Sequence, residues 1–159
     1  MREPVNPTAI QFQEEINARG IDTRVFEFDE TTRTAQDAAN AIGCEVGQIV
    51  KSLVFQGANS GKAILILISG ANRVDVEQLG AEIGEALKKA DADFVRAATG
   101  YAIGGVPPFG HASTSRPIVD EDLLKFDILW AAAGTPNAVF SVTTNELLRA
   151  CGGSVKKIT

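Results

Sequence analysis

The sequence has little of several residues that carry chemistry in proteins. It holds one histidine, two cysteines and a single Met, Trp and Tyr among 159 residues. A structural zinc site needs about four Cys or His ligands, so this composition excludes one. We expect no metal and no cofactor. Cys44 and Cys151 are expected to be reduced thiols rather than a disulfide, since no cysteine-rich framework surrounds them.

Long apolar runs are also missing. A run such as residues 63–68 is far too short to span a bilayer. Residues 1–4 include an acid and a proline where a signal peptide would have an apolar stretch. We therefore expect no membrane association and a cytoplasmic protein. The formal net charge of −5 argues against a broad duplex-binding surface, and no recognition-helix pattern is present, so DNA binding is not expected.

Helix and strand patterns are mixed along the whole chain. Helices are predicted over 7–20, 34–43, 75–83, 85–90, 93–98 and 144–150, and strands over 23–28, 49–56, 62–69, 117–119, 128–132 and 138–143. Strict strand–helix–strand alternation is missing, and several strands are joined by short turns. The sequence therefore predicts an α/β fold of the α+β type, one domain over residues 1–159, with a mixed, largely antiparallel sheet surrounded by helices.

Lys51 is the first candidate for chemistry. It lies inside the predicted strand 49–56, on the same face as Leu53 and Phe55, because strand side chains alternate. A lysine on a mostly buried strand is costly to desolvate unless its ammonium reaches a partner or a cleft. Taken alone, a strand-end lysine that extends to water is the simpler interpretation.

The segment 99–115 is dense in glycine and proline. Gly104 and Gly105 let the backbone approach a ligand closely, and Pro108 and the proline before it stiffen the end of the loop. Such a loop can aim N–H groups at an oxyanion or a phosphate, although a sharp structural turn is the alternative. Without Gly-Lys-Ser/Thr it is not a Walker P-loop. His111 is either a general base or a hydrogen-bonding partner of nearby backbone.

Together these two segments resemble the YbaK/prolyl-tRNA-synthetase-associated domain family. The run Gln48-Ile-Val-Lys-Ser-Leu-Val-Phe55 places the family's functional lysine at Lys51. The run Gly104-Gly-Val-Pro-Pro108 fits the family's Gly-x-x-x-Pro loop. Residues 69–74, 99–104 and 133–137 add supporting similarity, and the resemblance covers nearly the whole chain.

The resemblance implies aminoacyl-tRNA deacylation in trans. Family members hydrolyse the ester between a wrong amino acid and the terminal adenosine of a tRNA, and different branches remove alanine, cysteine, serine or threonine. The implied partner is the acceptor end of an aminoacyl-tRNA, with prolyl-tRNA synthetase or an elongation factor as further candidates. We expect a monomer or a weak homodimer.

The same resemblance suggests roles for individual residues. Lys51 would act as a positioning cation, and the N–H groups of Gly104 and Gly105 would stabilise an oxyanion. Predicted substrate-binding residues are Val25, Phe28, Ser69, Pro108, His111, Ala132 and Asn137. Ala132 and Asn137 are expected to tune the pocket, although Asn137 can equally be a turn residue. Two other functions stay open: a non-catalytic module that binds a tRNA end, amino acid or nucleotide, and a regulatory domain that docks on a synthetase.

Overall fold

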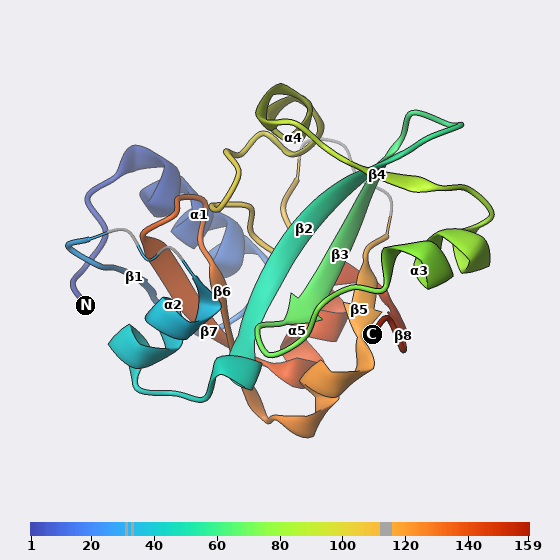
Figure 1. The fold of residues 1–159 in the computed structure, drawn as a ribbon. Helices are drawn as coiled ribbons and strands as arrows, with labels where there is room; N and C mark the ends of the chain where they lie inside the picture. The colour runs from blue at the N-terminus through green and yellow to red at the C-terminus, as the bar shows by residue number, and fades with distance from the viewer. Residues whose placement is uncertain (31, 33, 112–115) are drawn as a thin grey trace.

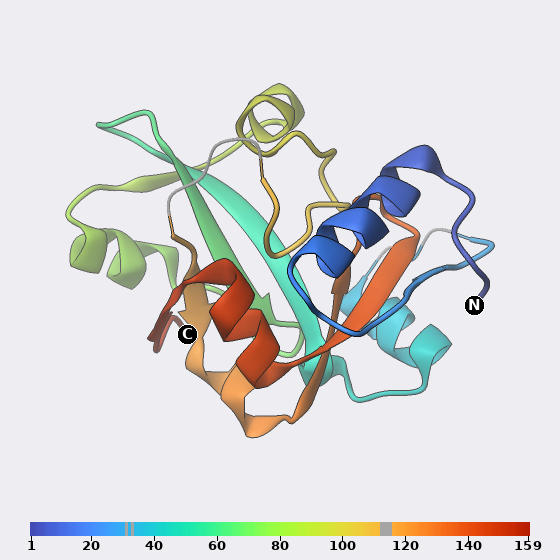
Figure 2. The ribbon, with the colours of Figure 1, turned by 180° about the vertical axis from the view of Figure 1, so that it is seen from behind.

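One sheet with helices on both faces organises the chain (Figures 1 and 2). The computed structural model describes residues 1–30, 32, 34–111 and 116–159. Within this part of the chain, eight strands form the sheet in the order β1-β7-β6-β2-β3-β5-β8, and β4 pairs with β2. The strands are β1 (Val25–Glu27), β2 (Ile49–Gly57), β3 (Ala63–Ser69), β4 (Leu87–Lys89), β5 (Ile118–Asp120), β6 (Ile128–Ala132), β7 (Ala138–Thr143) and β8 (Ser154–Lys156).

The sheet is mixed, as predicted. The pairs β1–β7, β6–β7, β2–β3 and β2–β4 are antiparallel. The pairs β2–β6, β3–β5 and β5–β8 are parallel. The helices are α1 (Pro7–Ala18), α2 (Ala35–Ile42), α3 (Val76–Ile83), α4 (Ala92–Thr99) and α5 (Thr144–Cys151), with 3-10 turns η1 (Val46–Gln48) and η2 (Glu121–Lys125). The predicted α+β fold is confirmed.

The two faces of the sheet carry different core clusters. Phe12 of α1, Val95 of α4 and Leu147 of α5 pack in the largest cluster, on the face seen in Figure 2. On the opposite face, Leu79 of α3 packs over β2 and β3 in a second cluster, and α2 packs against Ile49 in a third. The face that carries α2 and α3 is therefore covered at two separate places. Lys51 lies between them, because Ile49 belongs to the α2 cluster and Leu53 packs against the α3 cluster.

Local signals set most helix ends. The Asn6 side chain accepts a hydrogen bond from the Thr8 N–H, and Pro7 opens α1, as a cap followed by proline predicts. The Thr34 side chain caps α2, and Gly43 ends it in the left-handed region. For α5 the predicted cap lies one residue too late, because Thr143 rather than Thr144 makes the capping box with Glu146.

The helix predicted over residues 85–90 is wrong. Gly84 ends α3 at a φ of +95°, and the chain then forms β4, which pairs with the end of β2. The Glu85 carboxylate accepts hydrogen bonds from the N–H groups of Asn59 and Ser60, which ties the segment to the β2–β3 turn. Leu87 packs in the α3 cluster, so tertiary pairing overrides the local helical pattern.

Candidate active site

Strand β2 is paired with neighbouring strands along only part of its length on one side. Strand β3 pairs with it from Val50 to Gln56. On the other side, β6 pairs only with Ile49 and Val50, and β4 pairs only from Phe55 to Gly57. Among the described residues, no strand lies beside positions 51–54 on that side. The sheet therefore has a break there, and Lys51 stands at its border.

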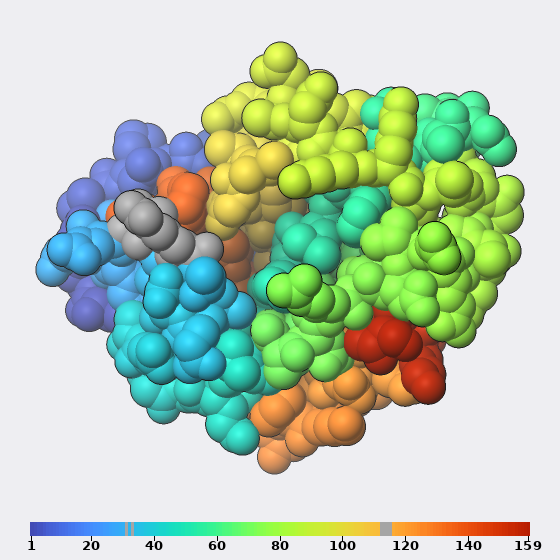
Figure 3. All heavy atoms as spheres, viewed as in Figure 1, coloured from blue at the N-terminus to red at the C-terminus, as the bar shows by residue number. Residues whose placement is uncertain are grey.

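Lys51 and Ala132 lie at the edge of this break, where β2 and β6 stop pairing. The last paired residues of the parallel β2–β6 ladder are Val50 and Ala131, so Lys51 and Ala132 are each the next residue along. Because side chains alternate, both lie on the face of Ile49 and Trp130, which also form a pair. Figure 3 shows a hollow in this face. It is bordered by the chain around the Gly–Pro loop (residues 104–108) in gold, β2 in blue-green and α2 in blue.

The Lys51 ammonium is held by a carbonyl group. Its Nζ donates to the Asn72 carbonyl oxygen at 3.0 Å. Within the described part of the chain, no carboxylate forms an ion pair with it. Partial burial, and secondarily the positive charge of Arg73, lower the pKa of Lys51 from its ordinary value. An ammonium with one neutral partner keeps two N–H donors for an anionic or carbonyl oxygen.

The Gly–Pro loop, residues 104–108, packs on the turn that comes after β6. Gly104 has a φ of +85°, which favours glycine. A Cβ added to Gly105 would lie 2.7 Å from the Thr135 Cα and 2.9 Å from the Gly134 oxygen. Since that turn begins one residue beyond Ala132, the loop is held next to the hollow. That Lys51 and this loop belong to one site stays a prediction.

The two glycines of this loop differ in the hydrogen-bond donors that they offer. The Gly105 N–H donates to the Ala102 carbonyl oxygen at 3.0 Å, so in this conformation it is not free for a substrate. Gly104 is exposed and has the left-handed backbone. Pro107 and Pro108 carry no N–H at all. Of the two predicted donors, only the Gly104 N–H has no acceptor among the described residues.

His111 stabilises the loop from within. Its Nε2 lies 2.5 Å from the Pro107 carbonyl oxygen, to which an Nε2–H group donates. Its ring meets the Tyr101 ring edge-on, with centroids 6.4 Å apart. Burial lowers its pKa. Pro108 is buried too. These contacts match the hydrogen-bonding alternative for His111, and residues 112–115, the end of the predicted irregular segment, lie outside the described residues.

Asn137 and Phe28 connect the early strand to the turn after β6. The Phe28 N–H donates to the Asn137 carbonyl at 2.8 Å, and the Asn137 Nδ2 donates to the Phe28 carbonyl at 3.1 Å. The Thr135 hydroxyl donates to Asn137 Oδ1 at 3.0 Å. Asn137 therefore fixes the turn on which Gly105 packs. Val25 lies deeper, within the large core cluster on the other face.

Three residues near Lys51 use their polar groups in ways that local sequence patterns do not predict. The Ser69 hydroxyl donates to the Gly47 carbonyl at 2.8 Å, so it supports the turn after β3. Asp120 is 1% exposed and contacts Asn72, although its sequence context resembles an ordinary acidic cap. Ser52 Oγ is buried without a hydrogen-bond partner in the described structure.

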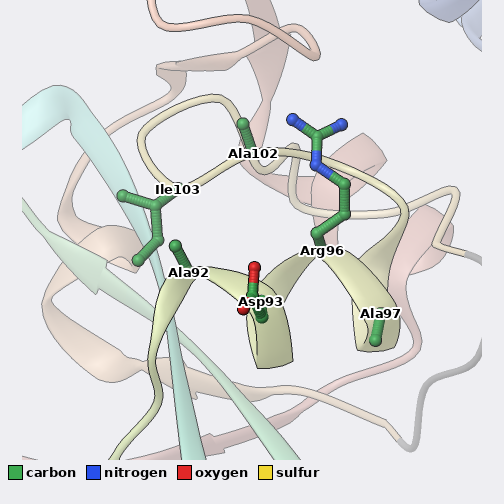
Figure 4. Close-up of a pocket in the computed structure, with 6 residues that line it drawn as sticks. All are labelled: Ala92, Asp93, Arg96, Ala97, Ala102 and Ile103. Atoms are coloured by element: carbon green, nitrogen blue, oxygen red, sulfur yellow. The ribbon is translucent and has the colours of Figure 1, made fainter.

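A second depression lies between α4 and the residues that precede the Gly–Pro loop. It is open and is lined by residues of α4 and by the two residues before Gly104 (Figure 4). Ile103 is 53% exposed there, and Arg96 and Asp93 extend from α4. The lining residues are Ala92, Asp93, Arg96, Ala97, Ala102 and Ile103.

Membrane spans and metal clusters are both absent from the described residues. None of the helices there is long and apolar enough to cross a bilayer. No group of three or more His, Cys, Asp or Glu side chains in that part of the chain is placed to hold a metal ion.

Comparison with known proteins identifies the family. The model of the aminoacyl-tRNA editing domain matches residues 29–150. The chain belongs to the aminoacyl-tRNA editing domain family. The matched range contains Lys51, the Gly–Pro loop and the turn on which that loop packs. The resemblance inferred from the sequence is confirmed.

Similar proteins agree with this assignment. A crystal structure of a candidate trans-editing enzyme for prolyl-tRNA synthetase superposes on this editing domain with a TM-score of 0.91. It is 44% identical and covers 98% of this chain and 99% of its own. The uncharacterized protein YwhH of Bacillus subtilis is 32% identical over 77% of this chain and 78% of its length. EbsC of Enterococcus faecalis, named as a candidate Cys-tRNA(Pro)/Cys-tRNA(Cys) deacylase, is 26% identical over 84% and 82%.

Proposed function

We propose that this editing domain is an aminoacyl-tRNA deacylase that acts in trans. It would hydrolyse the ester that joins a small, wrong amino acid to the terminal adenosine of a tRNA. The observation that carries the proposal is the position of Lys51, whose ammonium has no carboxylate partner among the described residues, at the end of the β2–β6 ladder. The Gly–Pro loop packs on the turn that follows β6 at the same end of the ladder. The family and the names of its similar proteins support the same substrate class.

The reaction needs little machinery because an aminoacyl ester is already activated. Water attacks the ester carbonyl, and the carbonyl oxygen becomes the oxyanion of a tetrahedral intermediate. The Lys51 ammonium and the Gly104 N–H group stabilise that charge, and one such donor is worth roughly 3 kcal/mol in other enzymes. Collapse of the intermediate breaks the bond to the ribose oxygen. The substrate's own amine or a ribose hydroxyl carries the proton.

Lys51 acts as a cation rather than as a base. A general base must be neutral at the working pH. Burial and the charge of Arg73 lower the pKa of Lys51, which works toward the neutral amine. The Asn72 carbonyl that accepts from Nζ favours the ammonium form. The ammonium is thus suited to hold the carbonyl oxygen, the attacking water or the phosphate of the terminal adenosine.

The amino acid would be sorted by size. Ala132 places a small side chain just beyond the last pair of the β2–β6 ladder, on the face that carries Lys51, and the turn held by Asn137 follows β6 directly. Alanine, cysteine, serine and threonine are the candidate residues to be removed. A small pocket separates substrates that differ by one methylene by only about 1–3 kcal/mol. Several of these esters are therefore expected to be cleaved at different rates.

The partner would be the acceptor end of the tRNA. Prolyl-tRNA synthetase and an elongation factor are the candidate proteins that present it, because an acidic chain with a net charge of −5 attracts tRNA only weakly by itself. We propose a cytoplasmic monomer or weak homodimer organised as one domain.

A deacylation panel tests the proposal. The protein is incubated with alanyl-, cysteinyl-, seryl- and threonyl-tRNA, with prolyl-tRNA as the cognate control. Release of at least one small amino acid, its loss in Lys51→Ala, and full activity in Lys156→Ala, an exposed lysine on the edge strand β8, are expected. Saturable binding of these tRNAs without ester cleavage would instead establish a non-catalytic binding module. Unchanged turnover by Lys51→Ala would remove Lys51 from the mechanism.

A further inference from the structure

The turn after β3 holds Lys51 and is itself fastened to β2 and η1. The Asn72 N–H donates to the Ser69 carbonyl at 2.9 Å, which closes the turn. The Gly70 N–H donates to the Ile49 carbonyl at 2.7 Å. A Cβ on Gly70 would lie 2.5 Å from the Val46 oxygen, so the turn lies directly against η1. One side of the turn is therefore fixed by backbone contacts.

The other side of the turn is fixed by two carboxylates. The Asn72 Nδ2 donates to Asp120 Oδ2 at 2.8 Å and to Asp122 Oδ2 at 2.7 Å. An amide NH₂ has two hydrogens, so both bonds can form together. Asp120 Oδ2 also accepts from the Ser69 N–H at 3.0 Å. Asp120 thus contacts the first and last residues of the turn that presents a carbonyl to Lys51.

Asp120 is unusual among the acidic residues near the hollow. It is 1% exposed, and within the described structure it forms no ion pair. A buried carboxylate is costly unless hydrogen bonds compensate it. Here three N–H donors do so, the third being the Asp122 N–H on Oδ1 at 3.0 Å. By contrast, Asp122 is partly exposed and pairs with Lys125 at 3.0 Å.

A lysine needs such a fixed partner in order to act at one place. Its four-carbon stem is flexible, and its ammonium has no directional plane like that of arginine. Lys51 lies between the two apolar clusters on its face, with a hydrogen bond to Asn72 and the like charge of Arg73 nearby. The position of the Asn72 carbonyl therefore decides where the ammonium sits.

We propose that Asp120, acting through the Asn72 amide, is a positioning residue for Lys51. The buried carboxylate holds the turn, the turn presents the Asn72 carbonyl, and that carbonyl orients the Lys51 ammonium toward the hollow. The proposal concerns how the site of the proposed deacylase is assembled. It rests on that function only for its kinetic arm.

Three variants test this chain of contacts. Asp120→Asn replaces a carboxylate that only accepts hydrogen bonds with an amide that also carries donors. Asn72→Ala removes the side-chain amide and leaves Asp120 intact. We call these two the clamp variants, because both break the hydrogen bond between Asp120 and Asn72. Glu121→Gln is the matched control, since Glu121 is the exposed acid that follows Asp120 in the chain and, among the described residues, makes no hydrogen bond to the turn after β3. In the first two variants kcat on the most active aminoacyl-tRNA is expected to fall about 10²-fold, because misplacement of a reacting group costs that much. KM should change little, and Glu121→Gln should keep its activity.

A second readout does not depend on catalysis. The NMR signal of the Lys51 side chain, assigned by its loss in Lys51→Arg, reports the surroundings of the ammonium. Asp120→Asn and Asn72→Ala should move this signal and its titration midpoint, and Glu121→Gln should leave both nearly unchanged. A fall in kcat with an unmoved Lys51 signal would overturn the positioning role. If Asp120→Asn does not fold, Asn72→Ala alone decides the matter by the same criterion.

Failure of the proposed function would look different. If the wild-type protein cleaves no aminoacyl-tRNA but the Lys51 signal responds to both clamp variants, the positioning inference stands and the deacylase proposal falls. If the deacylase is active and neither variant affects kcat or the Lys51 signal, the inference falls alone.

Discussion

Gly105 packs backbone to backbone against Thr135, although the two residues lie far apart in the sequence. This contact joins the Gly–Pro loop to the turn after β6 and leaves no room for a side chain at Gly105. It is the reason that a loop reached from α4 lies at the end of β6.

Gly105→Ala should therefore damage both stability and activity. The added methyl would meet backbone that cannot move aside cheaply, and overpacking of this kind typically costs about 1–3 kcal/mol. We expect a lower urea midpoint and reduced deacylation. Gly20→Ala is the matched control, because Gly20 has a φ of +73° with nothing within 4 Å of the added Cβ. It should lose about 1–2 kcal/mol from left-handed strain and keep full activity.

The pH profile of deacylation should reveal Lys51. If the ammonium is the active form, activity is lost as the pH rises through the Lys51 pKa, which lies below the usual 10.5. Arg73→Ala removes a like charge, raises that pKa, and should move the alkaline limb to higher pH. Arg73→Lys keeps the charge and should leave the limb in place. The rates are corrected for uncatalysed ester hydrolysis. An alkaline limb at the same pH in Arg73→Ala and in the wild type would contradict this prediction.

Acid should weaken the fold through His111. Burial lowers the pKa of His111 from 6.5 in the folded state, so the unfolded chain binds the proton more readily. Its stabilising contribution is present above pH 6.5 and is lost as the pH falls through the folded pKa. Denaturation midpoints measured between about pH 8 and about pH 5 should fall less steeply in His111→Gln than in the wild type. Equal slopes would show that His111 does not titrate on unfolding.

Ala132→Val should change which amino acid is removed. Added methyl groups beside Lys51 would narrow the hollow, and they should slow threonine and cysteine release more than alanine release. The expected change in relative kcat/KM corresponds to about 1–3 kcal/mol for each methylene-sized group. Competition assays with paired aminoacyl-tRNAs measure this directly. A uniform decrease for all substrates would place Ala132 outside the pocket that sorts them.

The sequence predicted the parts of this site better than their connections. The Lys51 strand, the Gly–Pro loop and the capped helices follow from local patterns and from family resemblance. The neighbourhood of Lys51 and Ala132 depends on the register of a parallel pair, which local patterns do not encode. Likewise, nothing local distinguishes Asp120, which is buried, from Glu121, the exposed acid that follows it in the chain.

Short strands explain the remaining errors. The segments that form β4 and β8 have three residues each, and their strand state comes from pairing with β2 and β5. The hydrogen bond that occupies the Gly105 N–H could not be predicted either, because it forms within the loop. Sequence patterns identify glycines that approach a neighbour, but not which N–H group stays free.

The break beside β2 has a consequence for the dynamics of the sheet. The Gly57 N–H bonds to Lys62, and the Ile49 carbonyl bonds to Gly70, so odd-numbered residues of β2 direct their backbone polar groups toward β3. Ser52 and Val54 must then direct theirs into the break. Their amide hydrogens should exchange with solvent deuterium far faster than those of Leu53 and Phe55. A ligand in the hollow would contact both parts of the sheet, which meet at Ile49 and Val50, and would slow that exchange. The exchange rates of the Ser52 and Val54 amides would therefore show when the site is filled.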